Sequence, residues 1–281
     1  MKRRSFLHAA TAILTTLPAA ATQMFRKNKM NSIRLIRHAT LEIEIGGMRV
    51  LIDPMLSEKG KLDPVKNAAN EIRIPMVDLP FDKTELERLV SSVDAIAVTH
   101  THRDHWDVEA QQLIPKSKII FCQPADAEKI RDQGFTDVRP IESSITLEKV
   151  QIHRTTGHHG TGEIGKQMGE VSGFVFIEGN SRIYIAGDTI WCTEVKDAIE
   201  KFDPTHIVVN SGGAQFLTGD PITMNAQDVT QVKQRSKNGK VIAVHMDVVN
   251  HCIVTRRILK EELAKNKISV LIPQDGETVY V

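Results

Sequence analysis

A group of histidines directly after a short apolar segment limits the fold of this chain more than any other feature. Residues 93–98 form an apolar run that predicts a buried strand, and His100-Thr101-His102-Arg103-Asp104-His105 follows at once. In an extended segment, side chains two residues apart point the same way, so His100 and His102 can bind one cation together. Asp104 and His105 lie at the predicted start of a helix, where the turn directs them towards a second, adjacent position.

Three imidazoles and one carboxylate within six residues are costly to hold close together unless a cation compensates them. The alternative is a solvated polar loop that happens to be rich in histidine. A lone histidine would fit that alternative well. Four potential ligands at this spacing, directly after a buried strand, favour a metal site.

Strand and helix signals are spread over most of the 281 residues. Three strand-like segments come first, at residues 32–37, 41–45 and 48–52, and Gly46-Gly47 predicts a two-residue hairpin turn between the last two. Residues 57–80 have charges, prolines and no clear period, which indicates a long loop. Later apolar segments alternate with helical patterns, without a repeat or an interdomain linker. This order favours a layered α/β sandwich around one core.

Composition restricts the partners that the chain can have. The formal net charge is +1 and aromatic residues make up 5%, so we expect neither a surface for a polyanion nor one that stacks nucleic-acid bases. The three cysteines, Cys122, Cys192 and Cys252, are far apart and are interpreted as packing residues. A small-molecule substrate, and no nucleic acid, is therefore the expected partner.

Residues 1–30 have the composition of an export signal and linker. The basic start is followed by the mostly apolar residues 7–17, and residues 18–21 are small enough for a signal peptidase. Arg3-Arg4-Ser5-Phe6-Leu7 resembles a twin-arginine signal, which directs export of folded proteins. We expect a periplasmic or otherwise exported protein with no membrane attachment after cleavage. The alternatives are an uncleaved apolar tail or anchor, and a cytoplasmic location.

The histidine segment resembles the HxHxDH signature of the metallo-β-lactamase superfamily. Members of that family take further ligands from later strand ends: a histidine, an aspartate in a Gly-Asp-Thr setting, and a last histidine. Here Gly187-Asp188-Thr189 matches the aspartate, and His245 follows an apolar strand as the last histidine does. For the middle histidine, one family pattern aligns with His158 and another with His159. We favour His159, and the other residue would contact the ligand shell or the substrate.

The resemblance implies a four-layer αβ/βα sandwich in a single domain, residues 31–281, with two divalent metal ions. The donors are imidazoles and carboxylates, which suit Zn²⁺, Mn²⁺ or Fe, and no thiolate is present to require Zn²⁺. We expect Zn²⁺ first, with Mn²⁺ or Fe as alternatives. The family's ligand roles carry over to His100, His102 and His159 for one metal, to Asp104, His105 and His245 for the other, and to Asp188 as the bridge.

This ligand set implies a metal-dependent hydrolase in which a hydroxide bridging two metals attacks a carbonyl carbon or a phosphorus. The protein then needs no serine or cysteine nucleophile. The proton donor for the leaving group is open: Asp104 and His251 are the catalytic candidates, and His38 is a third. Either histidine can equally be a hydrogen-bonded structural residue.

The early segments Ile36-Arg37-His38-Ala39-Thr40 and Leu51-Ile52-Asp53-Pro54 resemble one branch of the superfamily. That branch includes ascorbate-6-phosphate lactonase-like and phospholipase D-like hydrolases, so we expect a small ester, lactone or phosphoester as substrate. The alternatives are a β-lactamase, a di-iron oxidoreductase and a non-catalytic metal-binding protein. The best-known β-lactamases of this fold have a cysteine where Asp188 stands. The glycine-rich residues 160–169 are interpreted as a loop over the substrate or a plain surface connection.

Overall fold

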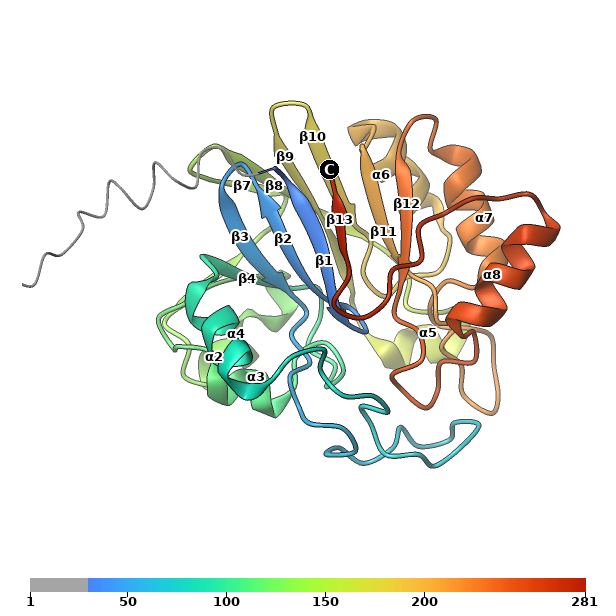
Figure 1. Cartoon of the computed structure of the whole chain (residues 1–281), viewed down its shortest axis with the longest axis horizontal. Helices are drawn as coiled ribbons and strands as arrows, with labels where there is room; N and C mark the ends of the chain where they lie inside the picture. The colour runs from blue at the N-terminus through green and yellow to red at the C-terminus, as the bar shows by residue number, and fades with distance from the viewer. Residues whose placement is uncertain (1–29) are drawn as a thin grey trace, which may run out of the picture.

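The computed structural model describes residues 30–281, which form two β-sheets packed face to face between two layers of helices (Figure 1). The predicted export signal, up to residue 29, lies outside the described residues. The first sheet has the strand order β13-β1-β2-β3-β4-β5-β6, and the second has the order β12-β11-β10-β9-β8-β7. The four-layer αβ/βα sandwich expected from the sequence is therefore confirmed.

The strands of the first sheet are β1 (Ser32–Arg37), β2 (Thr40–Ile45), β3 (Met48–Ile52), β4 (Ala95–Val98), β5 (Ile119–Cys122), β6 (Asp137–Pro140) and β13 (Thr278–Tyr280). The strands of the second are β7 (Ser144–Leu147), β8 (Val150–Thr156), β9 (Ser172–Glu178), β10 (Ser181–Ile185), β11 (His206–Asn210) and β12 (Lys240–Val244). The helices are α2 (Lys83–Ser92), α3 (Val108–Leu113), α4 (Ala127–Asp132), α5 (Gly162–Met168), α6 (Thr193–Phe202), α7 (Ala226–Arg235) and α8 (Arg256–Lys265), with a 3₁₀ turn at Pro124–Asp126.

The main core lies between the two sheets because alternate residues of each strand point inward. In β4, Ala95 and Ala97 face this central core, whereas Ile96 and Val98 face the layer that contains α2, α3 and α4. Both faces of the strand are therefore buried, which explains why its sequence is apolar throughout and does not alternate.

A second outer layer covers the other sheet. Helices α6, α7 and α8 pack their buried side chains, among them Val195, Val229 and Leu259, against the outward residues of β10, β11 and β12. Figure 1 shows these three helices beside the second sheet and α2, α3 and α4 beside the first. In the described part of the chain, no helix is long and apolar enough to span a bilayer.

The predicted hairpin turn is present between β2 and β3. Ile45 pairs with Met48, and Gly46 and Gly47 have φ angles of 59° and 83°. Two successive positive φ angles suit a type I′ turn, which glycine adopts without a steric penalty. The prediction of a long loop for residues 57–80 also agrees with the structure, which has only the isolated pair Leu62–Ile74 in that stretch.

The interpretation of residues 160–169 as an irregular loop was wrong in its local structure. Gly162–Met168 form the helix α5, although residues 160–169 contain four glycines. Gly165 N–H donates to the Thr161 carbonyl, and Lys166 pairs with Glu163 at 2.6 Å one turn apart. A local hydrogen bond and an i,i+3 ion pair therefore stabilise this short helix. The glycine-rich composition did not indicate a helix here.

Three polar residues at strand ends adopt an uncommon backbone conformation. His38 after β1, Asp53 after β3 and His245 after β12 have φ angles of 61°, 44° and 68°. The His245 N–H also donates to the His38 carbonyl at 3.0 Å. A left-handed conformation is disfavoured for residues with a Cβ atom and is a frequent feature of functional sites. All three residues lie where strand ends of the two sheets meet.

Candidate metal centre

The predicted ligands are brought together from four separate parts of the chain. His100, His102, Asp104 and His105 follow β4, and the remaining three each follow a strand of the second sheet. His159 comes after β8, Asp188 after β10 and His245 after β12. These strand ends meet at one edge of the sandwich, which is how side chains up to 145 positions apart in the sequence come to share one cluster.

The donors form adjacent groups whose ligand atoms lie within 4.8 Å of one another. His100, His102 and His159 form one group, and His100 Nε2 is 2.9 Å from His102 Nδ1. Asp104, His105 and His245 form another, together with His38. The structure thus assembles both ligand sets that the family resemblance implied.

Asp188 lies between the two groups. Its Oδ2 is 3.2 Å from His105 Nε2 and 3.6 Å from His159 Nε2, while its Oδ1 is 3.3 Å from His245 Nε2. Asn210 donates to Oδ1 at 2.6 Å and so orients the carboxylate. Oδ2 thus contacts a histidine of each group and Oδ1 a second histidine of one group, which places Asp188 between the two groups as the predicted bridging role requires.

Hydrogen bonds on the far side of two rings direct their free nitrogens into the cluster. His105 Nδ1 donates to Asp53 Oδ2 at 2.8 Å, and His159 Nδ1 donates to the Ile222 carbonyl at 2.8 Å. Each ring held in this way directs Nε2 into the centre, where that nitrogen presents a lone pair once it carries no proton. Asp53 is itself held by the Thr99 N–H and hydroxyl, both at 2.7 Å. Histidines that bind a metal in proteins typically donate their other ring N–H to a carboxylate or a carbonyl in this way, which fixes the orientation of the ring.

The electrostatics of the cluster also suit a cation. Burial alone would raise the pKa of the Asp188 carboxyl, yet the rings of His105 and His245 hold that pKa well below its usual range. Burial lowers the pKa of His105, but Asp188, Asp104 and Asp53 together raise it well above the usual value. The buried carboxylates therefore need positive charge beside them, which a divalent ion would supply.

Oxygen and nitrogen donors are the only ones directed into the centre by the described residues. The Cys252 sulfur lies 3.4 Å from His245 Nδ1, on the far side of that ring from the cluster, and burial raises the pKa of its thiol well above the usual value. Cys252 therefore lies beside a predicted ligand and outside the groups of converging donors. The residues present thus fit Zn²⁺, Mn²⁺ or Fe.

The structure separates the two candidates for the middle histidine. His159 is buried within the cluster, whereas His158 is largely exposed and pairs with Glu194 at 3.0 Å. Thr189 accounts for part of this arrangement, because its hydroxyl accepts the His158 N–H and fixes the chain just before His159.

The two further candidate histidines have different surroundings. The His38 ring is fully buried, donates from Nε2 to Asp104 at 3.2 Å and stacks on His245 with ring centroids 3.7 Å apart. It therefore contacts two of the predicted ligands and is not among the residues that line the cavity next to the cluster. His251 lines a cavity next to the cluster, and its Nδ1 has no hydrogen-bond partner among the described residues.

This cavity opens directly onto the cluster and has a volume of about 390 Å³. His102, Asp104, His159 and Asp188 form one wall. The remaining wall is mostly apolar, with Lys66 and Arg103 as its two cations, and consists of Asp63, Pro64, Val65, Lys66, Arg103, Met168, Phe216, Ile222 and His251. A volume at the lower end of the range for ligand pockets suits a small organic substrate.

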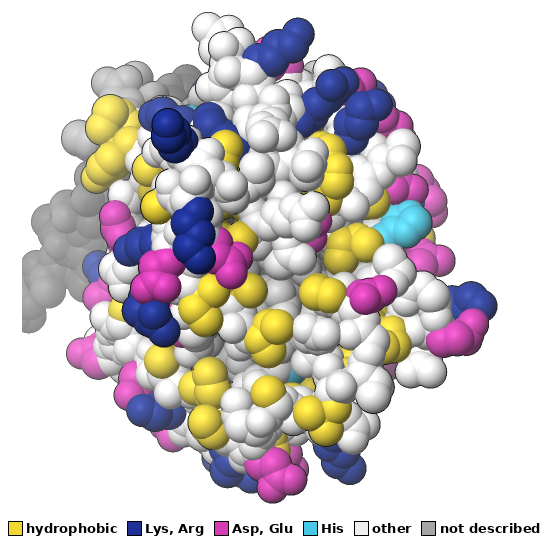
Figure 2. Space-filling view, turned by 90° about the vertical axis from the view of Figure 1, so that its right-hand side faces the viewer, with side chains coloured by type: hydrophobic (Ala, Val, Ile, Leu, Met, Phe, Trp, Pro, Cys, Tyr) yellow, Lys and Arg dark blue, Asp and Glu magenta, His cyan; other side chains and the backbone are white. Residues whose placement is uncertain are grey.

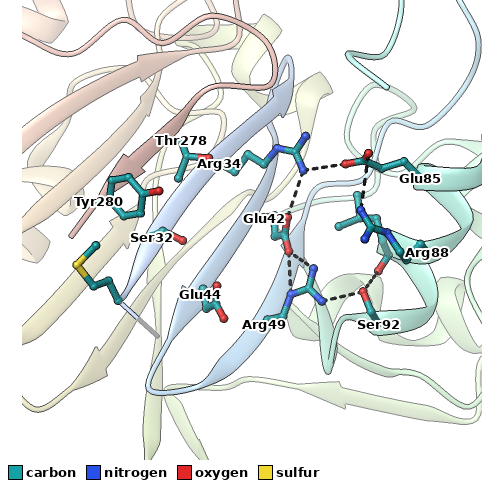
Figure 3. A pocket seen from close by; sticks show the side chains of 12 residues that line it. Ser32, Arg34, Glu42, Glu44, Arg49, Glu85, Arg88, Ser92, Thr278 and Tyr280 are labelled. Carbon is teal, nitrogen blue, oxygen red and sulfur yellow. Dashed lines mark hydrogen bonds and ion pairs between the residues drawn. The ribbon is translucent and has the colours of Figure 1, made fainter. Parts of the chain in front are cut away.

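A larger cavity of about 780 Å³ lies elsewhere, on the outer side of the first sheet beside α2 (Figure 3). Its charged side chains pair with each other: Arg34 contacts Glu42 and Glu85, Arg49 contacts Glu42, and Arg88 contacts Glu85. None of the metal-cluster residues lines it. Size alone is therefore a poor guide here, and the smaller cavity is the candidate active site.

Comparison with known proteins identifies the family. Residues 48–246 match the family described as the beta-lactamase superfamily domain. The UPF0173 protein YddR of Bacillus subtilis is 36% identical over 253 residues, which cover 88% of this chain and 98% of YddR. The chain belongs to the metallo-β-lactamase superfamily, and it is a metal-dependent hydrolase of that superfamily.

Two solved structures are similar over almost their whole length. A possible metal-dependent hydrolase from Veillonella parvula has a TM-score of 0.86 and 38% identity, covering 90% of this chain and all of that one. An isothiocyanate hydrolase from Delia radicum gut bacteria has a TM-score of 0.84 and 37% identity, covering 89% and 99%. The narrower resemblance to the ascorbate-6-phosphate lactonase-like branch stays a prediction.

The two adjacent histidines offer a matched test of the ligand assignment. We expect His159→Ala to weaken metal binding by more than roughly 100-fold, because loss of a second-shell partner alone weakens it by about 10–100-fold. His158→Ala should bind metal as the wild type does. Competition with a chromophoric chelator measures both affinities. Equal affinities in the two variants would contradict the assignment of His159.

Proposed function

We propose that this protein hydrolyses a small organic molecule at an electrophilic carbon, and that isothiocyanates are the substrate class to which it is best suited. The observation that carries the proposal is a His/Asp cluster forming one wall of a cavity of about 390 Å³ whose other wall is mainly apolar. Such a cavity can hold an apolar organic group with its reactive carbon next to the cluster. The 37% identity to an isothiocyanate hydrolase supports the choice of class.

We propose that the cluster holds two divalent ions, with Zn²⁺ as the first expectation. A bound divalent ion would lower the pKa of a coordinated water towards neutrality and stabilise negative charge on the substrate. Asp104 and Asp188 both line the cavity and can accept a proton from water there. His38 donates to Asp104 and so fixes the orientation of that carboxylate.

The reaction with an isothiocyanate is balanced by one water molecule. The water oxygen bonds to the central carbon, the carbon–nitrogen bond breaks, and both water protons end on the nitrogen, so that R–N=C=S and water give R–NH₂ and carbonyl sulfide. No oxidation is involved. The nitrogen needs a proton as it leaves. Burial lowers the pKa of His251 in the cavity wall to about 4, so this ring is the candidate to pass a proton from water to the nitrogen, with Asp104 as a relay.

Phosphoesters are a second candidate class because two cations line the same cavity. Lys66 and Arg103 are exposed and make no ion pair with other residues in the range 30–281. Either can approach a phosphate oxygen. Esters and lactones, also predicted from the sequence, would use the same cluster without these cations.

The expected absence of a nucleic-acid partner remains part of the proposal. On the face in Figure 2, basic and acidic side chains are interspersed. An even mixture of charges supports a small-molecule substrate more than a polyanion. We also propose export through a twin-arginine signal at residues 1–30, which sequencing the amino terminus of the protein from periplasmic extract would test.

A substrate panel tests the proposed class. Metal-loaded protein should turn over an aromatic isothiocyanate with a kcat/KM at least roughly 100-fold above that for a phosphodiester, a phosphomonoester, a lactone, a carboxylic ester and a β-lactam. Amine release measures the first reaction. Preference for a phosphoester would favour the second candidate, and no turnover of any substrate would favour a non-catalytic metal-binding protein.

His251 can be tested separately from the metal ligands. We expect His251→Gln to keep its bound metal and to lose about 100-fold in kcat, because general acid catalysis contributes about 10²–10⁴-fold. His153→Gln is the matched control, since His153 lies in β8, packs against Phe202 and does not line the cavity. An unchanged kcat in the His251 variant would contradict its catalytic role.

A further inference from the structure

The lining of the cavity outside the metal cluster includes part of one closed loop. Residues 62–74 leave and return at the same place, because Leu62 and Ile74 exchange backbone hydrogen bonds of 2.8 and 3.1 Å. We call residues 62–74 the cavity loop. Four of its residues, Asp63, Pro64, Val65 and Lys66, line the cavity.

One buried side chain holds the part of the cavity loop that faces the substrate space. Asn250 accepts the Val65 N–H at 2.8 Å through Oδ1 and donates through Nδ2 to the Val65 carbonyl at 2.9 Å and the Asn70 carbonyl at 2.7 Å. Its amide therefore makes both backbone hydrogen bonds of Val65, as a neighbouring strand would. Asn250 is only 2% exposed, so water does not compete for these bonds.

Asn250 also connects the cavity loop to the other cavity residues. It precedes His251 in the chain, and the His251 carbonyl accepts the Gln215 N–H at 2.9 Å. The Leu217 N–H donates to the Asn67 carbonyl at 2.7 Å, on the outer part of the cavity loop. Phe216, between these two residues, lines the cavity and stacks near the His251 ring. The substrate-facing wall is thus one hydrogen-bonded unit centred on Asn250.

Other contacts also hold the cavity loop, several of them at its base. Arg73 donates to the Gly60 and Lys61 carbonyls and pairs with Asp63. A small apolar cluster of Met55, Ile74, Val248 and Val249 packs beneath, and the Val65 side chain lies partly buried against it. Without Asn250, the loop would keep these contacts and the Leu217–Asn67 hydrogen bond, but the backbone N–H and carbonyl of Val65 would lose their buried hydrogen bonds.

We propose that Asn250 is a positioning residue that sets the width of the substrate cavity, and with it the size of substrate that is accepted, by fixing the cavity loop at Val65. The proposal rests on the proposed function for its effect on substrates, but not for its effect on the loop. Among residues 30–281, Asn250 makes no hydrogen bond to a predicted metal ligand, so metal binding should not depend on it.

The test compares Asn250→Ala and Asn250→Asp with Asn31→Ala. Asn31 is a matched control, because its amide also links distant segments, accepting from Gly46 N–H and donating to Ser181, far from the cavity. Asn250→Asp keeps the shape of the side chain but turns the carbonyl-facing donor into an acceptor. It should therefore loosen the cavity loop at least as much as Asn250→Ala does.

Two measurements distinguish the proposed role of Asn250 from the proposed hydrolysis of isothiocyanates. Hydrogen exchange of metal-loaded protein needs no substrate, and we expect exchange of the Val65 amide to rise at least roughly tenfold in both Asn250 variants and to stay unchanged in Asn31→Ala. With a small and a bulky isothiocyanate, the ratio of the two KM values should shift at least roughly fivefold towards the bulky substrate, with metal content unchanged.

Unchanged exchange at Val65, or an unchanged KM ratio with a loosened loop, would overturn the proposal. So would failure of both Asn250 variants to fold, because the amide would then hold the whole domain and not one wall. If the wild type turns over neither isothiocyanate, the proposed substrate class fails, and the same KM ratio is measured with whichever substrate pair the panel identifies.

Discussion

The metal cluster depends on imidazole rings whose outer nitrogens are fixed by hydrogen bonds, so that their other nitrogens point towards one another. Asp53 and the Ile222 carbonyl each accept a hydrogen bond from one ring nitrogen, and the opposite nitrogens of His105 and His159 then face the centre. Facing lone pairs beside buried carboxylates are unfavourable without a cation. The uncommon backbone conformations of His38, Asp53 and His245 support this interpretation, because such strain persists where the surroundings determine it.

In this fold the strands position the predicted metal ligands, and the loops form much of the rest of the cavity wall. Every predicted ligand directly follows a strand or lies within the turn after β4, so the rigid sheets determine the metal geometry. The substrate-facing wall comes largely from the segments around Val65, Phe216 and His251, which belong to no sheet. A superfamily can therefore keep its metal chemistry while its loops change the substrate, which is why membership alone does not determine what this protein hydrolyses.

Local signals were strong enough to predict the layered fold, the hairpin at Gly46-Gly47 and the ligand cluster. The roles of Asp53, Asn210 and Asn250 could not be predicted, because each acts on a residue far away in the sequence and none lies in a spacing that is typical of a site. The structure also makes His38 a partner of Asp104, where the sequence left it as a candidate proton donor. Helix α5 was missed because its glycines obscure the helical pattern.

We propose that the converging donors hold a pair of divalent ions. Elemental analysis of protein purified without chelator, for the wild type and for Asp188→Ala, tests this proposal. We expect about two equivalents in the wild type and loss of metal from the variant, since Asp188 contacts both groups. A wild type that binds no metal, or a variant that keeps both equivalents, would contradict it.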